Sequence, residues 1–371
     1  VRENIEDTYG GVEHRLSNDM IQCKRLISAP GSDEVHRFAF QTARRLGVKK
    51  VHCGHKANIM KMTDGLFLDR FRAVARDFPE MEAADVIVDA LCMNLVVKPQ
   101  QYGMIVLPNL QGDIVSDLCA GLVGGLGFAP SANIGRHISI FEAVHGTAPD
   151  IAGKGIANPC SLILSGVMML RHVGLLKQAA TIENALLASL EQGVHTGDFG
   201  DKRSPALGTV PFVQAIIERL GSGPKTIPAA PVPEQATPSF RHPHKPASPH
   251  LIRTFKNLLT HVAGCDIYLD TALSPLALAE EMQRACADTP FKLTLISNRG
   301  TQVWPTGSVY TEMADYFRVR FELKDGVTPG SFGQSRAIAL LDKIAESHVV
   351  GSYELLRTYE GVKGYSLAQG Q

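Results

Sequence analysis

The chain has 371 residues, which is long enough for two or three domains that each bury a hydrophobic core. Lysine plus arginine and aspartate plus glutamate both number 37, so no net charge draws the chain to nucleic acid or to anionic lipid. The seven cysteines form no C-x-x-C pair and are odd in number, which argues against a disulfide framework or a zinc ribbon. We therefore expect that the protein is found in a reducing compartment and binds a small soluble ligand.

The sequence offers no segment for a membrane. No apolar run reaches the roughly 18 residues that a bilayer crossing needs, and the first residues, VRENIED, are charged rather than signal-like. We therefore expect a soluble, cytoplasmic protein. The sequence starts at Val1 within an apparent motif, so we also expect that upstream sequence is missing.

Helices and strands alternate in the first part of the chain. Ser32 can cap a helix with apolar residues at the 3.6 period that Gly47 can end, and its acidic first turn and basic last turn suit the helix dipole. A strand is predicted at 51–53, a helix over 66–78, and buried strands at 86–88 and 104–107. This alternation predicts a layered α/β architecture.

A proline-rich segment divides the chain. Eight of the 21 prolines lie between Pro224 and Pro249, which predicts a semi-extended linker over 223–250. Beyond the linker, strands at 265–270, 291–297 and 317–323 and helices near 277–287 and 335–347 predict a small α/β domain over 251–371. Residues 1–222 are predicted to form the larger domain.

The most informative local pattern is NLQGDIVSDL at 109–118. Asp113 and Asp117 are four residues apart, which on a helix puts two like charges on one face. A solvated helix face would explain the pair, but it follows a buried strand and a glycine turn, where α/β proteins tend to place ligand sites. Asp89 ends the strand at 86–88, and three such carboxylates would suit Mg²⁺ or Mn²⁺.

Two other segments offer groups for proton transfer. HKANIMK at 55–61 follows a strand, and Lys56 could be an ordinary surface lysine. A lysine beside a divalent cation is nevertheless a plausible base at neutral pH. RENIEDTYGG offers Arg2 for a carboxylate and Tyr9 as a proton donor, although Tyr9 before two glycines also suits a turn residue that packs on a core.

The segment FEAVHGTAPDIAGKGIANP at 141–159 supplies a glycine-containing loop. Glycine and small side chains permit the close approach of a flat ligand, and His145 could stack on it or hydrogen-bond to it. The loop is no Rossmann fingerprint, because no G-x-G-x-x-G pattern followed by a helix is present. Taken alone, it would be interpreted as a structural turn.

The combination and order of these segments resemble the isocitrate and isopropylmalate dehydrogenase family of β-decarboxylating oxidoreductases. The resemblance covers residues 1 to about 221 and implies that family's layered α/β/α fold, truncated at the N-terminus. EDTYGGVEH looks more like isocitrate dehydrogenase than the isopropylmalate branch. Over most of 251–371, notably TPFKLTLISNRGTQVWP, the chain resembles the longer bacterial isocitrate dehydrogenases.

The resemblance implies oxidative decarboxylation of isocitrate to 2-oxoglutarate and CO₂, with Mg²⁺ or Mn²⁺ and a nicotinamide dinucleotide, in a homodimer or higher homo-oligomer whose subunits share the active site. Arg2 would hold a substrate carboxylate. Lys56, contributed across the dimer, would help deprotonate the 2-hydroxyl, and Tyr9 would protonate the enolate left by CO₂. The implied metal ligands, the last from a neighbouring subunit, are Asp113, Asp117 and Asp89. The implied cofactor-binding residues are Asn58, His145, Gly146, Thr147, Ala148, Asp150, Ile151 and Asn158.

Asp150 and Ile151 predict that NAD is preferred to NADP. In NADP-using relatives a lysine and a tyrosine usually occupy this pair, whereas a carboxylate accepts hydrogen bonds from a ribose 2′-hydroxyl and repels a 2′-phosphate. The alternative is that Asp150 only caps a helix after Pro149.

Three other interpretations stay open at this point. The substrate could be homoisocitrate or 3-isopropylmalate, because the serine, asparagine and arginine residues that grip it in the family lie in the missing N-terminal part. The chain could be a noncatalytic regulatory subunit, although retention of the catalytic and metal-binding residues argues against that. The C-terminal domain suggests a structural or subunit-contact role and leaves an effector-binding role open.

Overall fold

The computed structural model describes residues 1–371 apart from 17–18, 136, 232–259, 308–312, 332 and 367–371. The chain divides into two compact units, each built from segments that are not contiguous in sequence. The first unit holds Val1–Asn4, Ser32–His55 and Arg70–Pro246. The second holds Ile5–Gly31, Lys56–Asp69 and Ala247–Gln371. Most of the proposed linker lies outside the described residues, so the domain boundaries stay a prediction.

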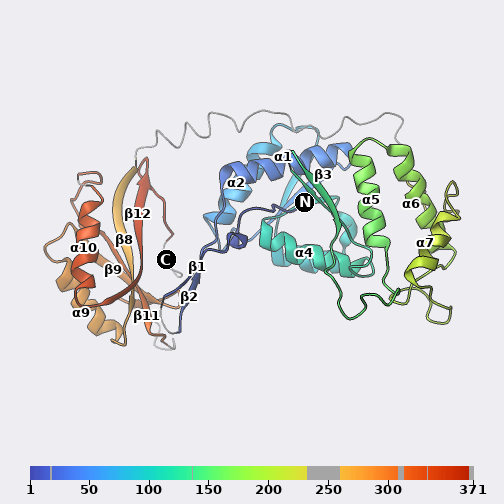
Figure 1. Cartoon of the computed structure of the whole chain (residues 1–371). Coiled ribbons are helices and arrows are strands. Elements are labelled where there is room, and N and C mark those ends of the chain that lie inside the picture. The colour runs from blue at the N-terminus through green and yellow to red at the C-terminus, as the bar shows by residue number, and fades with distance from the viewer. Residues whose placement is uncertain (17–18, 136, 232–259, 308–312, 332, 367–371) are drawn as a thin grey trace. The chain divides into compact units, whose positions relative to one another are not determined.

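A parallel sheet forms the centre of the first unit (Figure 1). Its middle strand β3 (Lys50–His55) pairs with β4 (Glu82–Ile87) on one side and β5 (Met104–Val106) on the other. The N-terminal residues continue the sheet beside β5, since the Leu107 N–H donates to the Val1 carbonyl and the Glu3 N–H to the Leu107 carbonyl, both at 3.0 Å. This pairing holds Arg2 at the end of β5.

Four helices accompany this sheet: α1 (Ala29–Arg45), α2 (Thr63–Ala75), α3 (Val88–Val97) and α4 (Asn109–Leu122). α3 and α4 share a buried core that includes Leu91, Leu107 and Val115. Gly54 of β3 lies directly beneath, where a β-carbon would overlap the side chains of Leu107 and Leu91. Glycine there lets the strand and the helices pack closely.

The first unit continues into a helical layer. An antiparallel hairpin of β6 (Pro130–Ile134) and β7 (Ser139–Ala143) packs on α5 (Cys160–His172), which is followed by α6 (Leu176–Glu191) and α7 (Thr209–Ile217). Cys160, Leu186 and Phe212 are buried where the three helices meet. The loop before α5 carries most of the proposed cofactor residues, and Asn158 joins it to the loop after α6 by a hydrogen bond to Asp198.

The second unit contains an antiparallel sheet with the strand order β10-β9-β11-β8-β12-β13. Along the chain it runs β8 (Thr260–Asp270), α9 (Pro275–Cys286), β9 (Phe291–Asn298), β10 (Thr301–Trp304), β11 (Tyr316–Leu323), α10 (Ser335–Ala345), β12 (Val349–Tyr359) and β13 (Val362–Lys363). The four main strands and two helices form the βαββαβ, ferredoxin-like arrangement.

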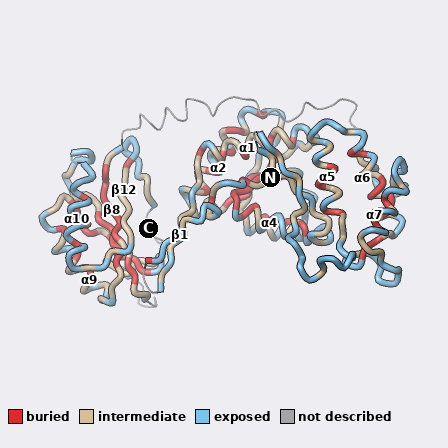
Figure 2. The backbone as a smooth tube through the Cα atoms, in the orientation of Figure 1, coloured by how far each residue is buried: buried red, intermediate tan, exposed pale blue. Residues whose placement is uncertain are grey.

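Both helices of this sheet pack on one of its faces, where alternate residues such as Ile267, Val319 and Phe321 are buried with Leu278 and Leu340 (Figure 2). The N-terminal part of this unit adds the short helix η1 (Thr8–Gly10) and a two-stranded sheet of β1 (Glu13–Arg15) and β2 (Ile21–Cys23).

The layered α/β prediction is confirmed, but three local predictions were wrong. α1 begins at Ala29 rather than after Ser32, because Ser28 accepts a hydrogen bond from the Gly31 N–H at 3.1 Å and takes the capping role. α2 starts and ends three residues earlier than predicted. β4 ends at Ile87, so Val88 and Asp89 begin α3. None of the helices in the described ranges combines the length and the apolar character that a membrane crossing requires.

Candidate functional site

Arg2 and the start of α4 form the first group of proposed site residues. The Arg2 guanidinium donates to Asn109 Oδ1 at 2.8 Å and forms an ion pair with the carboxylate of Asp113. Gly112 makes room for it, since a β-carbon there would lie 2.7 Å from Arg2 Cγ. The sequence NLQGD thus brings a buried amide, a glycine and a carboxylate around one arginine.

The fold places the proposed metal ligands on two helices. Asp113 and Asp117 lie one turn apart on α4, and both carboxylates reach solvent. Asp89 lies in the first turn of α3, exposed, rather than at the end of a strand. Within the described ranges of one chain, no three acidic, histidine or cysteine residues come together to hold a metal. The three aspartates therefore do not meet within one chain, and their assignment as ligands of one shared metal stays a prediction.

The donor chemistry of α4 still fits a hard divalent cation. Two accessible carboxylates on one helix face supply oxygen ligands, and Mg²⁺ is usually held by one or two carboxylates, with water and substrate completing its shell. The Asp113 side chain is 45% exposed although it pairs with Arg2, so the pair can rearrange without uncovering a buried charge. The placement of Asp89 in a neighbouring subunit stays a prediction.

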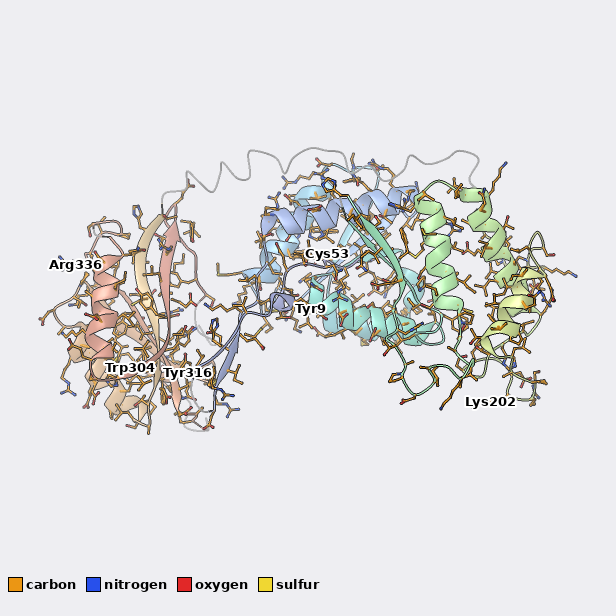
Figure 3. All side chains as sticks on the ribbon, viewed as in Figure 1. Tyr9, Cys53, Lys202, Trp304, Tyr316 and Arg336 are labelled. Carbon is orange, nitrogen blue, oxygen red and sulfur yellow. The ribbon has the colours of Figure 1, made fainter. Side chains whose placement is uncertain are left out.

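The proposed acid–base residues lie in the second unit, in two separate segments. Tyr9 lies on η1, and half of its side chain is exposed (Figure 3). This exposure does not fit the alternative of a turn residue packed on a core. Lys56 follows β3 directly, and its backbone N–H donates to Asp64 Oδ2 at 2.6 Å.

A buried arginine joins the Tyr9 segment to the Lys56 segment. Arg25 forms ion pairs with Asp7, which precedes η1, and with Asp64, which receives the Lys56 N–H. Asp7 and Asp64 are completely buried, and Asp7 adopts the left-handed φ of 73° while its carboxylate accepts from the Thr8 N–H at 2.9 Å. Such a conformation persists only where surrounding contacts hold it. Arg25 therefore holds the Tyr9 segment and the Lys56 segment in place through its buried ion pairs.

Electrostatics account for the stability of this charged group. Burial disfavours the charge on Arg25, but the hydrogen bonds and charges of Asp7 and Asp64 outweigh that effect and raise the pKa of the guanidinium above its ordinary value. The arginine stays protonated, and each carboxylate has a cation beside it. Sequence reasoning did not identify Arg25, Asp7 or Asp64 as part of the site.

The proposed cofactor residues are mostly on an exposed loop of the first unit. His145, Gly146, Thr147 and Asp150 are all exposed, and Ala148 takes the left-handed φ of 43°. Asn158 closes this loop: its amide donates to Asp198 Oδ2 at 3.0 Å and its carbonyl oxygen accepts from the Cys160 N–H at 3.0 Å. Asn58, the other proposed contact, is exposed in the second unit.

Asp198 is a residue that sequence reasoning missed. It also accepts from the Thr196 hydroxyl, so it ties the 145–158 loop to the loop after α6 that carries Lys202 (Figure 3). The motif HTGDFGDK at 195–202 was the available signal, but its spacing does not show which loop it contacts.

These features define a layered α/β protein with an accessible arginine–carboxylate site, and a family comparison identifies it. The model described as isocitrate/isopropylmalate dehydrogenase matches residues 1–216, and the one described as bacterial isocitrate dehydrogenase, C-terminal domain, matches residues 260–371. The chain belongs to the isocitrate/isopropylmalate dehydrogenase family.

Curated relatives cover the whole chain. The isocitrate dehydrogenase [NADP] of Thermus thermophilus is 42% identical over 373 residues, which span 100% of this chain and 73% of the relative. A crystal structure of a Thermus thermophilus protein matches with a TM-score of 0.88 at 40% identity, covering 100% of this chain and 72% of that one. A mitochondrial isocitrate dehydrogenase [NAD] regulatory subunit from Dictyostelium discoideum is 51% identical over 222 residues, or 59% of this chain and 63% of its own length.

The predicted preference for NAD is contradicted, because the relatives that span this chain are isocitrate dehydrogenases [NADP], including the Thermus protein and Rickettsia proteins at 35–37% identity. The structure supplies a physical reason. Asp150 is exposed in a turn, where water and salt screen its charge, so it repels a phosphate only weakly. It also caps no helix, since residues 149–153 form a turn.

Proposed function

We propose that the chain catalyses the metal-dependent oxidative decarboxylation of isocitrate, with NADP as the hydride acceptor. The arrangement of Arg2, Asn109 and Asp113 carries the proposal, because it sets a guanidinium for a substrate carboxylate beside an accessible carboxylate for a cation. The full-chain relatives named as isocitrate dehydrogenases support the choice of substrate.

Arg2 would bind and orient a substrate carboxylate. Its guanidinium has five N–H donors, so it can hold that carboxylate while it keeps Asn109, and its half-exposed pair with Asp113 can open for the cation. Asp113 and Asp117, with Asp89 from a second copy of the chain, would hold Mg²⁺ or Mn²⁺. Bound there, the cation would act as a Lewis acid that polarises the 2-hydroxyl and stabilises negative charge as CO₂ leaves.

Lys56 and Tyr9 would move the protons. We propose that Lys56 of a second copy accepts the proton of the 2-hydroxyl and that Tyr9 delivers a proton to the carbon from which CO₂ has departed. The Arg25 network gives both side chains a rigid base, and Tyr9 extends from it into solvent. Rigid support is what proton transfer needs, since the reacting groups must meet at hydrogen-bond distance.

The exposed loop at 145–158 would receive NADP. His145 can stack on or hydrogen-bond to the nucleotide, and Asn158 would contact it while Asp198 holds the loop closed. Lys154 on this loop and Lys202 on the loop tied to it are exposed cations that suit a 2′-phosphate.

Calorimetry of Mn²⁺ binding to the 371-residue chain tests the metal assignment. Asp113→Asn should weaken Mn²⁺ binding by about tenfold or more, because a hard cation loses an anionic ligand, whereas Asp77→Asn, at an exposed surface ion pair, should leave it unchanged. Equal affinity of Asp113→Asn and the parent chain would refute the assignment.

Turnover separates the remaining alternatives. The proposal expects cofactor reduction that requires isocitrate and proceeds with a higher kcat/KM for NADP than for NAD. Faster turnover of homoisocitrate or 3-isopropylmalate would reassign the substrate. Binding of isocitrate without turnover would favour a regulatory role, as the name of the Dictyostelium relative describes for that protein.

A further inference from the structure

A cavity of about 340 Å³ lies in the second unit, away from Tyr9 and Lys56, between the β1–β2 sheet and the open face of the six-stranded sheet. Its volume is in the range of small-molecule sites. One wall is apolar and comes from Leu16, Met20 and Ile21. The opposite wall is polar and comes from β8, β9 and β11, with Tyr268, Ser297, Tyr316 and Arg318.

Strand alternation explains why these polar side chains share a face. In β11, Phe317 and Val319 point to the helices, so Tyr316 and Arg318 point the other way. Arg318 is opposite Tyr268 on β8 and opposite Ser297 on β9, which sets the polar groups side by side on three neighbouring strands.

Several buried polar atoms at this cavity lack partners. Tyr316 is 5% exposed, yet its hydroxyl has no hydrogen-bond partner within the described part of the chain. The same holds for Arg318 Nε and for Gln22 Oε1 on the facing strand β2. Buried polar groups are nearly always paired, and a ligand in this cavity would supply partners for all three.

The neighbouring arginine on the same strand shows what satisfied pairing looks like here. Arg320 donates to both carboxylate oxygens of Asp266, at 2.7 and 2.8 Å, and Tyr365 lies over its guanidinium. Arg318 lies within reach of the Tyr268 hydroxyl instead, and no described carboxylate forms an ion pair with it. On this strand, Asp266 therefore neutralises the Arg320 guanidinium, whereas the Arg318 guanidinium has an N–H donor available for a ligand.

We propose that this cavity binds a small organic carboxylate with an apolar body. The guanidinium edge of Arg318 and the hydroxyl of Tyr316 are donors that suit a carboxylate. Leu16, Met20 and Ile21 would cover the apolar part of the ligand. Gln22 supplies an acceptor for a further polar group.

Two backbone features shape the cavity. Arg299 sits at its rim with the left-handed φ of 50°, in the tight turn that it forms with Gly300 between β9 and β10. Gly351 is the second feature. A β-carbon there would come within 2.8 Å of the Leu16 carbonyl and 2.9 Å of the Tyr316 ring. Glycine at 351 lets the apolar wall approach the tyrosine that bears the unpartnered hydroxyl.

Isothermal titration calorimetry of the 371-residue chain with benzoate, benzamide and benzylammonium tests the proposal at fixed ionic strength. The three probes share an apolar body and differ in charge. Benzoate should bind with one-to-one stoichiometry and about tenfold or more tightly than the other two, since a charge-assisted hydrogen bond changes affinity by about this factor. Excess isocitrate with Mn²⁺ should not displace it.

Variants locate the binding. Arg318→Gln should weaken benzoate about tenfold, and Tyr316→Phe, which keeps the ring, should weaken it severalfold. Arg336→Gln is the control, because Arg336 is exposed on α10, on the other face of the sheet (Figure 3). Circular dichroism shows whether each variant folds. If Arg318→Gln does not fold, the benzoate affinity of Tyr316→Phe tests the proposal instead. Equal binding of the three probes, no binding of benzoate, displacement by isocitrate, or unchanged benzoate affinity in the folded variants would each overturn the proposal.

Discussion

Two arginine–carboxylate clusters, one in each unit, use the same residue types for opposite purposes. Arg2 and Asp113 are 28% and 45% exposed, so water competes for their charges. Arg25 is 14% exposed and its partner Asp64 is 0% exposed, so those charges depend on each other. The first pair can exchange partners with a ligand, whereas the second serves as a support. Burial, rather than residue type, therefore separates a binding group from a structural one.

Removal of Arg25 should have the largest effect. Arg25→Ala leaves the buried carboxylates of Asp7 and Asp64 without their cation and should lower the free energy of unfolding by about 3–5 kcal/mol. Urea denaturation followed by circular dichroism measures the loss. Arg37→Ala, which breaks an exposed pair with Asp77, should cost at most about 1 kcal/mol. A similar loss in both variants would mean that burial does not distinguish these pairs.

Removal of the charge of Asp113 should affect stability much less. Asp113→Asn breaks a half-exposed pair and should change the free energy of unfolding by less than about 1 kcal/mol, although it weakens Mn²⁺ binding. Asp64→Asn, at a completely buried position, should cost several times more in the same urea titration. If the Asp113 variant were the less stable of the two, the cluster at Arg2 would be structural as well.

The smallest effect is expected at Glu191. It tests the comparison of exposed and buried carboxylates, because it is a surface carboxylate with a structural role. The Thr226 hydroxyl, together with the Lys225 and Thr226 N–H groups, lowers the pKa of Glu191 to about 2. Its contribution to stability is therefore complete above its ordinary pKa of 4.5 and is lost as the pH falls through about 2.

A carboxyl titration followed by ¹³C NMR measures this directly. Thr226→Ala removes the strongest interaction and should raise the pKa of Glu191 toward its ordinary value. Thr181→Ala, earlier on the same helix, serves as the control, because the Thr181 hydroxyl donates to the Lys177 carbonyl rather than to Glu191. An unchanged Glu191 pKa in Thr226→Ala would assign the shift to the backbone N–H groups alone.

The sequence predicts the layered fold and the family because those depend on local patterns and on the order of motifs. Apolar periodicity located the helices α1, α2, α9 and α10, and NLQGDIVSD placed Asp113 and Asp117 on one helix. The start of α1 could not be predicted, because serine suits the cap position at Ser28 as well as at Ser32 and only the hydrogen bond from Gly31 identifies Ser28.

Features built from distant segments could not be predicted in this way. Arg25 reaches partners 18 and 39 positions away, and no spacing rule connects an arginine to two aspartates at such separations. One wall of the cavity at Tyr316 and Arg318 likewise comes from a distant segment, from Leu16 and residues 20–23. The cofactor prediction failed for a related reason, since a one-letter code shows the charge of Asp150 but not that solvent surrounds it.

The ion pair between Lys24 and Glu354 joins positions that are 330 residues apart, within one compact unit. A ribosome adds about 5–20 residues per second, so the first strands of this unit emerge long before the strands with which they pack. Apolar residues of the N-terminal segment, such as Leu16, therefore stay exposed until the C-terminal sheet has been synthesised and has folded. Contacts of such high sequence separation form slowly, so the apolar residues of this segment are exposed to aggregation on the nascent chain.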